Sequence, residues 1–274
     1  FRTLPTAKVQ AYSTASESIK RGFKRTAIIY VNNDFGIDML RLYKAAMLKQ
    51  GGQIIVEVPY NDNQPSYRAE VTKALADKPE SVFVIGFPKD GVTIVREWLS
   101  LGGTQKMALN NSMRVKDFVE GVGGRFLNDA FGMDNAQVAG PTVDAFNKLF
   151  EDKYKTDTKG PGVHTQYDAI MAIGLAMNIA KELTGPSIKD AVRLIHVPGG
   201  ATIGTGPDEY KKALALIKEG KPIKYHGATG PIEFDANGDV AGPALVWKVV
   251  NGELVTDRVI LIEEVQKLTK LVEG

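Results

Sequence analysis

Residues 26–36 have the sequence TAIIYVNNDFG, and this stretch decides the fold. Its first part, residues 26–31, is an apolar run rich in β-branched side chains. The run is too short for a helix and has the character of a buried parallel strand. Turn-forming residues follow, and Gly36 then opens residues 37–50, where apolar side chains recur at helical spacing. We therefore predict a strand, a tight loop and a helix, the kind of junction at which open α/β sheets bind ligands.

Four such strand–helix units succeed one another in the first half of the chain, after a helix predicted at 6–20. Strands that alternate with helices in this way imply a Rossmann-like parallel sheet with helices on both faces. After the first unit, the sequence predicts strand 53–58 with helix 66–76, strand 81–86 with helix 90–101, strand 106–109 with a short helix at 115–120, and a fifth strand at 126–131.

Helical patterns dominate the second half of the chain. The helix predicted at 164–183 is largely apolar, so we expect it to be buried. The segment 197–206 is rich in Gly and Pro and is expected to be a loop, and Asn251-Gly252 indicates a hairpin. The remaining predicted elements are helices 141–154, 187–195 and 207–219, strands 232–234, 245–250 and 254–260, and a helix at 262–272. Because residues 140–220 offer apolar helix faces but almost no strands, we expect that a sheet for them to cover is missing.

The composition is ordinary for a soluble globular protein, with 43% hydrophobic and 24% charged residues. The formal net charge of +2 provides no large basic surface, so nucleic acid is not an expected partner. No apolar run approaches the roughly 20 residues that span a bilayer. The chain has no cysteine, which excludes disulfides, cysteine catalysis and cysteine-ligated metals.

Residues 34–36 spell the D-F-G magnesium motif of kinases, but the other kinase motifs are absent. All three histidines lie downstream of it, and none begins the H-R-D motif that a kinase carries upstream. A Gly-x-Ser-x-Gly nucleophile elbow is also absent. Residues 204–206 lack the third glycine of a dinucleotide fingerprint, and residues 235–239 do not fit a calcium loop. We therefore predict no enzyme activity, no cofactor and no metal site.

Five segments, taken in their order along the chain, carry a family resemblance. They are FRTLPT at 1–6, KRTAIIYVNNDFG at 24–36, VFVIGFPKDGVTIVREWLSLG at 82–102, VHTQYDAIMAIGLAM at 163–177 and YHGATGPIEFDANGDVAGPALVWKVVNGELV at 225–255. Together they resemble the type I periplasmic solute-binding proteins of ABC transporters, the branched-chain amino acid receptor family. No single segment is diagnostic, but the ordered set covers nearly the whole chain.

The resemblance implies a type I periplasmic-binding-protein fold with two lobes. It places residues 1–133 and 242–274 in lobe II and residues 134–241 in the C-terminal part of lobe I. Family members begin with a further lobe I segment on the order of a hundred residues. This chain begins at Phe1, without a methionine or a signal peptide. We therefore expect that the N-terminal part of lobe I is missing, and a missing segment of the same protein is one candidate partner.

Three loops are expected to meet at one edge of the sheet, because the carboxyl ends of parallel strands share an edge. They bring two aromatic rings together with amide and hydroxyl groups, which is the usual lining of a small-molecule cleft. The predicted ligand-binding residues are Asp34, Phe35, Gly36, Phe87, Pro88, Asn110, Asn111 and Ser112, with Tyr167 facing the cleft from lobe I. The alternatives are that Phe87 packs at the rim of the sheet, that the asparagines only form turns, and that Tyr167 belongs to a helix cap.

The resemblance places Phe35, Phe87 and Asn111 at positions that contact the ligand in the branched-chain receptors. Those receptors carry tyrosine at two of these positions, and at the third an acidic residue that pairs with the ligand's ammonium group. An amide such as Asn111 does not neutralise an ammonium group as a carboxylate does. The expected ligand is therefore a small amino acid, an amide or an organic, possibly aromatic, acid, and the choice stays open.

The resemblance implies a periplasmic, extracytoplasmic receptor. Its two lobes would close about a hinge to capture the solute between them, and the closed form would deliver the solute to an ABC permease. A cytoplasmic ligand-sensing regulator on the same fold is the alternative. An α/β enzyme is a third hypothesis, and the lack of a recognisable nucleophile–base pair or metal cluster opposes it.

Overall fold

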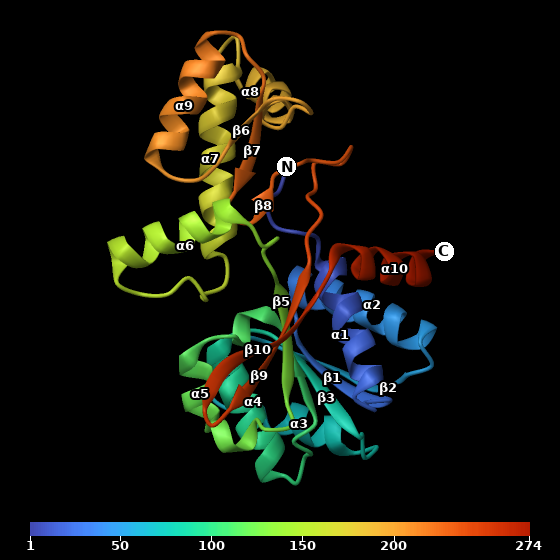
Figure 1. Cartoon of the computed structure of the whole chain (residues 1–274). Coiled ribbons are helices and arrows are strands. Elements are labelled where there is room, and N and C mark those ends of the chain that lie inside the picture. Colours follow the sequence, from blue (N-terminus) through green and yellow to red (C-terminus); the bar gives the residue numbers. More distant parts are fainter. The chain divides into compact units, whose positions relative to one another are not determined.

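The computed structural model describes all residues, 1–274, and the chain divides into two compact units (Figure 1). The large unit consists of Thr6–Asn135 and Pro243–Gly274, and the small unit of Phe1–Pro5 and Ala136–Gly242. The chain therefore passes from one unit to the other three times. None of its helices combines the length and the apolar character that crossing a membrane requires.

The large unit is built on a seven-stranded sheet in the order β10-β9-β5-β4-β3-β1-β2. From β2 to β5 all neighbouring strands are parallel, whereas β9 runs antiparallel to both β5 and β10. The strands are β1 (Arg25–Val31), β2 (Gln53–Tyr60), β3 (Ser81–Ile85), β4 (Met107–Leu109), β5 (Phe131–Asn135), β9 (Ala244–Val250) and β10 (Glu253–Ile260). The predicted mixed α/β architecture with a largely parallel sheet is confirmed.

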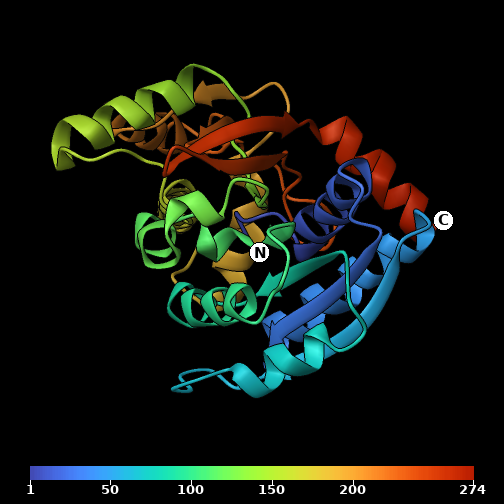
Figure 2. The ribbon, with the colours of Figure 1, turned by 90° about the horizontal axis from the view of Figure 1, so that it is seen from below.

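Helices cover both faces of this sheet because its central strands are apolar on both sides; every residue of β3 is buried. One core cluster joins the strands to α1 (Ala7–Lys20), α2 (Asp34–Lys49) and α10 (Ile262–Glu273). Figure 2 shows α10, in red, beside the dark blue α1. The other helices of the large unit are α3 (Arg68–Leu75), α4 (Pro88–Ser100) and α5 (Lys116–Val122), with the short 3-10 helices η1 (Asn111–Met113) and η2 (Gly124–Phe126).

The small unit has a three-stranded sheet in the order β6-β7-β8. Its elements are α6 (Pro141–Tyr154), α7 (Val163–Ile179), α8 (Gly185–Val192), η3 (Arg193–Ile195), β6 (Ala201–Ile203), α9 (Pro207–Lys218), β7 (Ile223–Gly227) and β8 (Gly230–Pro231). A second core cluster, which includes Leu175, Ile203 and Tyr225, joins α7, α8 and α9 to β6 and β7. This unit therefore has its own small hydrophobic core.

A buried carboxylate ties α7 to the turn between β7 and β8. Asp168 is fully buried and accepts four hydrogen bonds: from the Tyr225 hydroxyl at 2.8 Å, the Ala228 N–H at 2.7 Å, the Thr229 N–H at 2.8 Å and the Thr229 hydroxyl at 2.6 Å. Burial raises the pKa of Asp168, and these hydrogen bonds act in the opposite direction. The four donors supply the stabilisation that a cation provides to other buried carboxylates.

The first five residues lie in the small unit, whereas the sequence analysis places them in lobe II. The Arg2 N–H donates to the Gly238 carbonyl at 2.9 Å, and the Arg2 guanidinium forms an ion pair with Asp239 at 2.7 Å. The Thr3 hydroxyl donates to the Thr165 carbonyl at 2.8 Å. These contacts link residues far apart in the sequence, so local patterns do not reveal them.

Three predictions about strands are wrong. A strand was expected at 232–234, but β8 is Gly230–Pro231 and Phe234 forms only an isolated bridge with Val240. The fifth strand was expected at 126–131, but residues Gly124–Phe126 form a 3-10 helix and the strand is Phe131–Asn135. This segment pairs with both β4 and β9, and the pairing outweighs the poor strand propensity of its Gly, Asp and Asn residues. Residues 197–206 were expected to be a loop, but they contain β6, which pairs with β7 at Ile223–Gly227. The small unit therefore has a sheet that the sequence pattern did not indicate.

The prediction that the long apolar helix is buried is also wrong for one of its faces. Leu175 and Ala176 of α7 are buried in the core of the small unit. Ile170, Ile173 and Met177 are exposed by 73%, 54% and 41%, respectively. The three-stranded sheet covers one side of α7 and leaves the other side as an apolar surface.

Candidate functional site

The loops after β1, β3 and β4 lie along the carboxyl edge of the seven-stranded sheet. Strands β4, β3 and β1 are neighbours and run parallel, so their carboxyl ends share that edge. The structure therefore gathers eight of the predicted residues at one edge of the large unit. Tyr167 is the exception, because it lies in α7 of the small unit.

Two phenylalanine rings form an aromatic pair at this edge. The ring centroids of Phe35 and Phe87 are 6.0 Å apart and the ring planes are tilted by 31°. Phe35 also packs against the core, whereas Phe87 is 42% exposed. Pro88 begins α4 and fixes the backbone directly after Phe87. An exposed ring held on a rigid turn is suited to contact an apolar ligand.

The start of α2 fits the tight turn after β1. The Asn33 side chain caps the helix by accepting a hydrogen bond from the Gly36 N–H at 3.0 Å. A side chain at Gly36 would collide with the Val31 carbonyl, so only glycine fits there. Asp34 lies exposed in the first helical turn, where a negative charge interacts favourably with the helix dipole. Gly36 and Asp34 thus have structural roles that are sufficient to explain their presence.

Asn110 is a buried bridge between two of the loops. Its Oδ1 accepts a hydrogen bond from the Gly86 N–H at 3.0 Å, and its Nδ2 donates to the Ser112 Oγ at 2.7 Å. The side chain is 1% exposed, so it positions its neighbours and does not present itself to solvent. Asn111 and Ser112 are half-buried, so their side chains are more accessible than that of Asn110.

An ion pair lies beside these loops. Neither of its residues is among those predicted from the sequence. Arg114, which directly follows η1, places its Nη1 3.2 Å from the Oδ2 of Asp134 near the end of β5. Their side chains are 13% and 9% exposed. Burial raises the pKa of Asp134, and the adjacent guanidinium acts in the opposite direction. The sequence offered one signal for this pair, since Arg114 lies three residues after Asn111. It did not indicate the partner Asp134, which is 20 residues away.

Buried tyrosines support the loop that carries Phe87. The Tyr67 hydroxyl donates to the Oδ1 of Asp90, in the first turn of α4, at 2.7 Å. Burial raises the pKa of Tyr67 to about 12, and the bond to Asp90 adds to the shift. The neighbouring Tyr60 is fully buried, and its ring centroid is 5.1 Å from that of Tyr67. These contacts fix the N-terminus of α4 and hence the position of Phe87.

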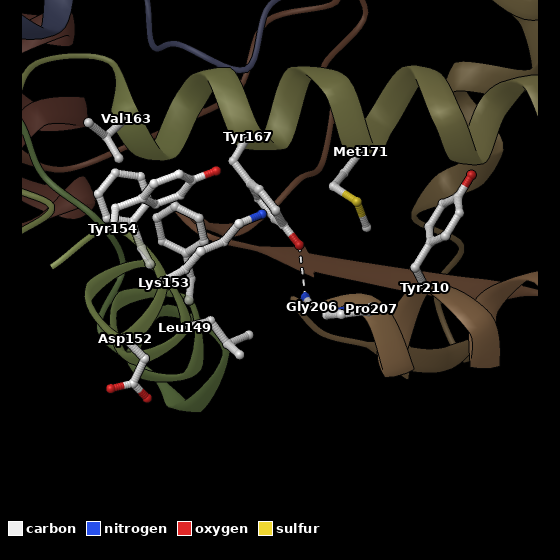
Figure 3. Close-up of a pocket in the computed structure, with 12 residues that line it drawn as sticks. Leu149, Asp152, Lys153, Tyr154, Val163, Tyr167, Met171, Gly206, Pro207 and Tyr210 are labelled. Atoms are coloured by element: carbon white, nitrogen blue, oxygen red, sulfur yellow. Dashed lines mark hydrogen bonds between the residues drawn. The ribbon is translucent and has the colours of Figure 1, made fainter.

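Tyr167 lines a cavity of about 700 Å³ in the small unit (Figure 3). Its hydroxyl oxygen accepts a hydrogen bond from the Gly206 N–H at 2.8 Å, and its ring lies 4.7 Å from that of Phe146. Burial raises the pKa of Tyr167 above its ordinary value. The cavity is lined by Phe146, Leu149, Phe150, Asp152, Lys153, Tyr154, Val163, Tyr167, Met171, Gly206, Pro207 and Tyr210.

The chemistry of this cavity differs from that of the sheet edge. Side chains from α6, α7 and α9 converge on it, and most of them are aromatic or aliphatic (Figure 3). Lys153 and Asp152 are the charged residues of its lining, and the Lys153 Nζ lies 5.2 Å from the centre of the Tyr154 ring. Neither unit contains a cluster of three His, Cys, Asp or Glu side chains that could hold a metal ion.

Comparison with known proteins identifies the family of the chain. The family model described as periplasmic binding protein matches residues 1–245. The chain belongs to the periplasmic binding protein family. This agrees with the resemblance carried by the five sequence segments and with the parallel sheet of the large unit.

Individual members of the family are distant in sequence. The substrate-binding protein BasB of a chemotactic signal transduction system in Halobacterium salinarum is 22% identical over 238 residues, which cover 86% of this chain and 54% of BasB. The chain thus spans about half the length of this curated relative.

Solved structures share the fold. The leucine binding protein LivK from Thermotoga maritima has a TM-score of 0.77 and 18% identity, over 96% of this chain and 68% of LivK. A solute binding protein of an ABC transporter from R. palustris, in complex with benzoate, has a TM-score of 0.67 and 13% identity, over 95% of this chain and 65% of that protein. At these identities the likeness concerns the fold.

Proposed function

We propose that the chain acts in an extracytoplasmic receptor that binds a small organic solute at the carboxyl edge of the large unit. The observation that carries this proposal is the meeting of Phe35, Phe87, Asn111 and Ser112 on three adjacent loops. Apolar rings with a few placed polar groups are the usual composition of a small-molecule site. Membership of the periplasmic binding protein family supports the same function.

The large unit corresponds, in this proposal, to lobe II of the family fold, and the small unit to the C-terminal part of lobe I. The partner is an ABC permease that receives the solute, as is usual for the transport proteins of this family. Tyr167 remains a proposed contact from the small unit. Its place in a cavity lined mostly by apolar side chains makes it a weaker candidate than the residues of the sheet edge.

The proposed ligand is a small amino acid or an organic acid with an apolar or aromatic body. Leucine and benzoate appear as ligands among proteins of the same fold. The Phe35–Phe87 pair suits either an aliphatic or an aromatic body, because both rings offer apolar surface. The half-buried Asn111 supplies an amide that donates to a carboxylate or accepts from an ammonium group.

Isothermal titration calorimetry of the 274-residue chain with leucine and with benzoate tests this function. Phe87→Ala and Asn111→Ala should each weaken binding roughly tenfold, since each removes a contact worth about 1–2 kcal/mol. Phe87 is exposed, so its removal should leave the folded state almost as stable as the wild type.

Tyr154→Ala is the matched control, because it removes an exposed aromatic ring at the cavity of the small unit. We expect it to bind as the wild type does. Unchanged affinity in both the Phe87 and the Asn111 variants would show that the sheet edge is not the binding site. Loss of binding in the Tyr154 variant alone would move the site to the cavity.

A further inference from the structure

We propose that Arg114 anchors a carboxylate group of the ligand, so that the solute is recognised as an organic acid. This inference rests on the proposed function and adds the chemical class of the ligand. Arg114 lies at the end of η1, three residues after Asn111, and therefore belongs to the same loop as the polar groups of the site. Arg114 is not among the ligand-binding residues predicted from the sequence.

The guanidinium of Arg114 has hydrogen-bond donors without a partner in the protein. Of its five N–H groups, the structure uses those on Nη1 for the Oδ2 of Asp134 at 3.2 Å. The side chain is 13% exposed, and none of its nitrogens is both buried and without a partner. The donors on Nε and Nη2 therefore reach solvent. These two groups form the planar fork that binds a carboxylate through two parallel hydrogen bonds.

Asp134 holds the Arg114 side chain in place and uses only its Nη1. It approaches from β5, while the chain at Arg114 is fixed by the N–H of Arg114 donating to the Asn111 carbonyl at 3.0 Å. A long side chain that is tied at both ends loses less conformational freedom when it binds a ligand. The pair is consequently a preorganised donor, in contrast to an exposed lysine such as Lys89, which is free in solvent apart from one bond to Asn63.

The acidic groups at the same edge are poorly placed to hold a ligand's ammonium group. The Oδ1 of Asp90 already accepts from the Tyr67 hydroxyl and from the Asn63 N–H. Asp134 is paired with Arg114. Asp34 is exposed to water in the first turn of α2, where an ion pair is worth little. Asn111 is an amide and carries no negative charge.

Two helix N-termini add to the attraction for an anion. Helices α2 and α4 both begin at this edge, at Asp34 and Pro88, and each directs the positive end of its dipole toward the loops. With the guanidinium of Arg114 they create a local preference for negative charge. The apolar rings of Phe35 and Phe87 would then pack against the body of an aromatic or aliphatic acid.

Two acid–amide pairs test the inference by calorimetry: benzoate with benzamide, and 4-methylpentanoate with 4-methylpentanamide. Each amide has nearly the shape of its acid but carries no charge. In the wild type, the acid of a pair should bind roughly 10- to 100-fold more tightly than its amide, the range expected for a charge-assisted, bidentate hydrogen bond. The Arg114→Gln/Asp134→Asn variant should lose most of this preference and keep only the few-fold remainder that the two helix N-termini supply.

The double variant removes both charges together, because Arg114→Gln alone would leave the Asp134 carboxylate buried without its cation and could unfold the protein. Arg114→Lys, which keeps the charge but loses the fork, should show an intermediate preference and provides a second, conservative variant. Arg125→Gln is the matched control, since it removes an exposed positive charge in η2 and leaves the loop of Arg114 intact. It should keep the full preference for the acid.

The outcomes separate the two proposals. An acid preference that is as large in the double variant as in the wild type, or acid and amide binding equally well to the wild type, overturns the role of Arg114 and leaves the receptor function intact. Leucine also carries a carboxylate, so leucine that binds the double variant as tightly as the wild type does the same. If neither these four compounds nor leucine binds to the folded wild type, the receptor function fails and the role of Arg114 fails with it.

Discussion

Helix α4 of the large unit and helix α7 of the small unit both carry an apolar face, but α4 leaves none of its large apolar side chains exposed, whereas α7 leaves three. Ile94, Val95 and Trp98 of α4 are completely buried beside the seven-stranded sheet. On α7, Leu175 is equally buried, while Ile170 and Ile173 are mostly exposed. The amount of sheet available to each helix accounts for the difference, because a three-stranded sheet presents less surface to cover.

The two units also differ in the kind of ligand site that each offers. At the edge of the large unit, a small number of polar groups lie on three loops. Hydrogen bonds of buried residues such as Asn110 and Asp90 hold these loops in place. The cavity of the small unit has about 700 Å³ of space and a mostly apolar lining. A rigid scaffold that aims a few polar groups gives specificity, whereas an apolar surface alone gives little discrimination between ligands.

The largest expected effect concerns Asp168, on which the small unit depends. Asp168→Ala would strand four donors, those of Tyr225 and Ala228 buried and the two of Thr229 partly buried, and each loss costs on the order of 1 kcal/mol. We expect the free energy of unfolding to fall by about 4 kcal/mol, measured by urea denaturation with circular dichroism. A loss below about 1 kcal/mol would mean that this carboxylate does not hold the β7–β8 turn.

The contrast within α7 gives the next largest effect. Leu175→Ala should lower the free energy of unfolding by about 3 kcal/mol, because it creates a cavity in the core of the small unit. Ile173→Ala, on the exposed side of the same helix, should change it by less than about 0.5 kcal/mol. Equal losses in the two variants, measured by the same denaturation experiment, would show that the exposed face of α7 is covered in solution.

The smallest effect is a pH dependence that involves His226. Burial lowers the pKa of His226 from its ordinary value of 6.5, and the neighbouring His196 and Lys224 add to the shift. The folded state therefore binds a proton less tightly than the unfolded chain does. Stability contributed by the neutral ring is present above pH 6.5 and declines as the pH falls below it. In His226→Gln this part of the decline should disappear from thermal melts between pH 7 and pH 5, and a decline as steep as in the wild type would contradict it.

Much of the large unit follows from sequence patterns, because its parallel strands are short apolar runs and its helices have regular spacing. The exceptions are instructive. Residues Phe131–Asn135 contain poor strand formers and become a strand only through pairing with β4 and β9. Residues Ala201–Ile203 are too few to give a pattern, and they need β7 to form a strand.

In the site, too, residues that follow from local sequence patterns could be predicted, and residues that depend on distant partners could not. The loops with Phe35, Phe87 and Asn111 could be predicted, since each follows a recognisable strand of a parallel sheet. The role of Arg114 could not be predicted, because it depends on the ion pair with Asp134, which lies 20 residues away in the sequence. Tyr167 was predicted to face the cleft from lobe I, whereas its contacts with Phe146 and Gly206, which place it in the wall of a cavity of the small unit, could not be predicted.

Hydrogen–deuterium exchange of the whole chain, with and without the tightest-binding of the tested solutes, examines the central claim most directly. A ligand at the sheet edge should slow exchange of the backbone amides at 33–37, 86–91 and 110–115 in the large unit. Helix α6 at the cavity of the small unit should exchange at an unchanged rate. Slower exchange in α6 and around Gly206, with no change in the three loops, would contradict the account and assign ligand binding to the cavity.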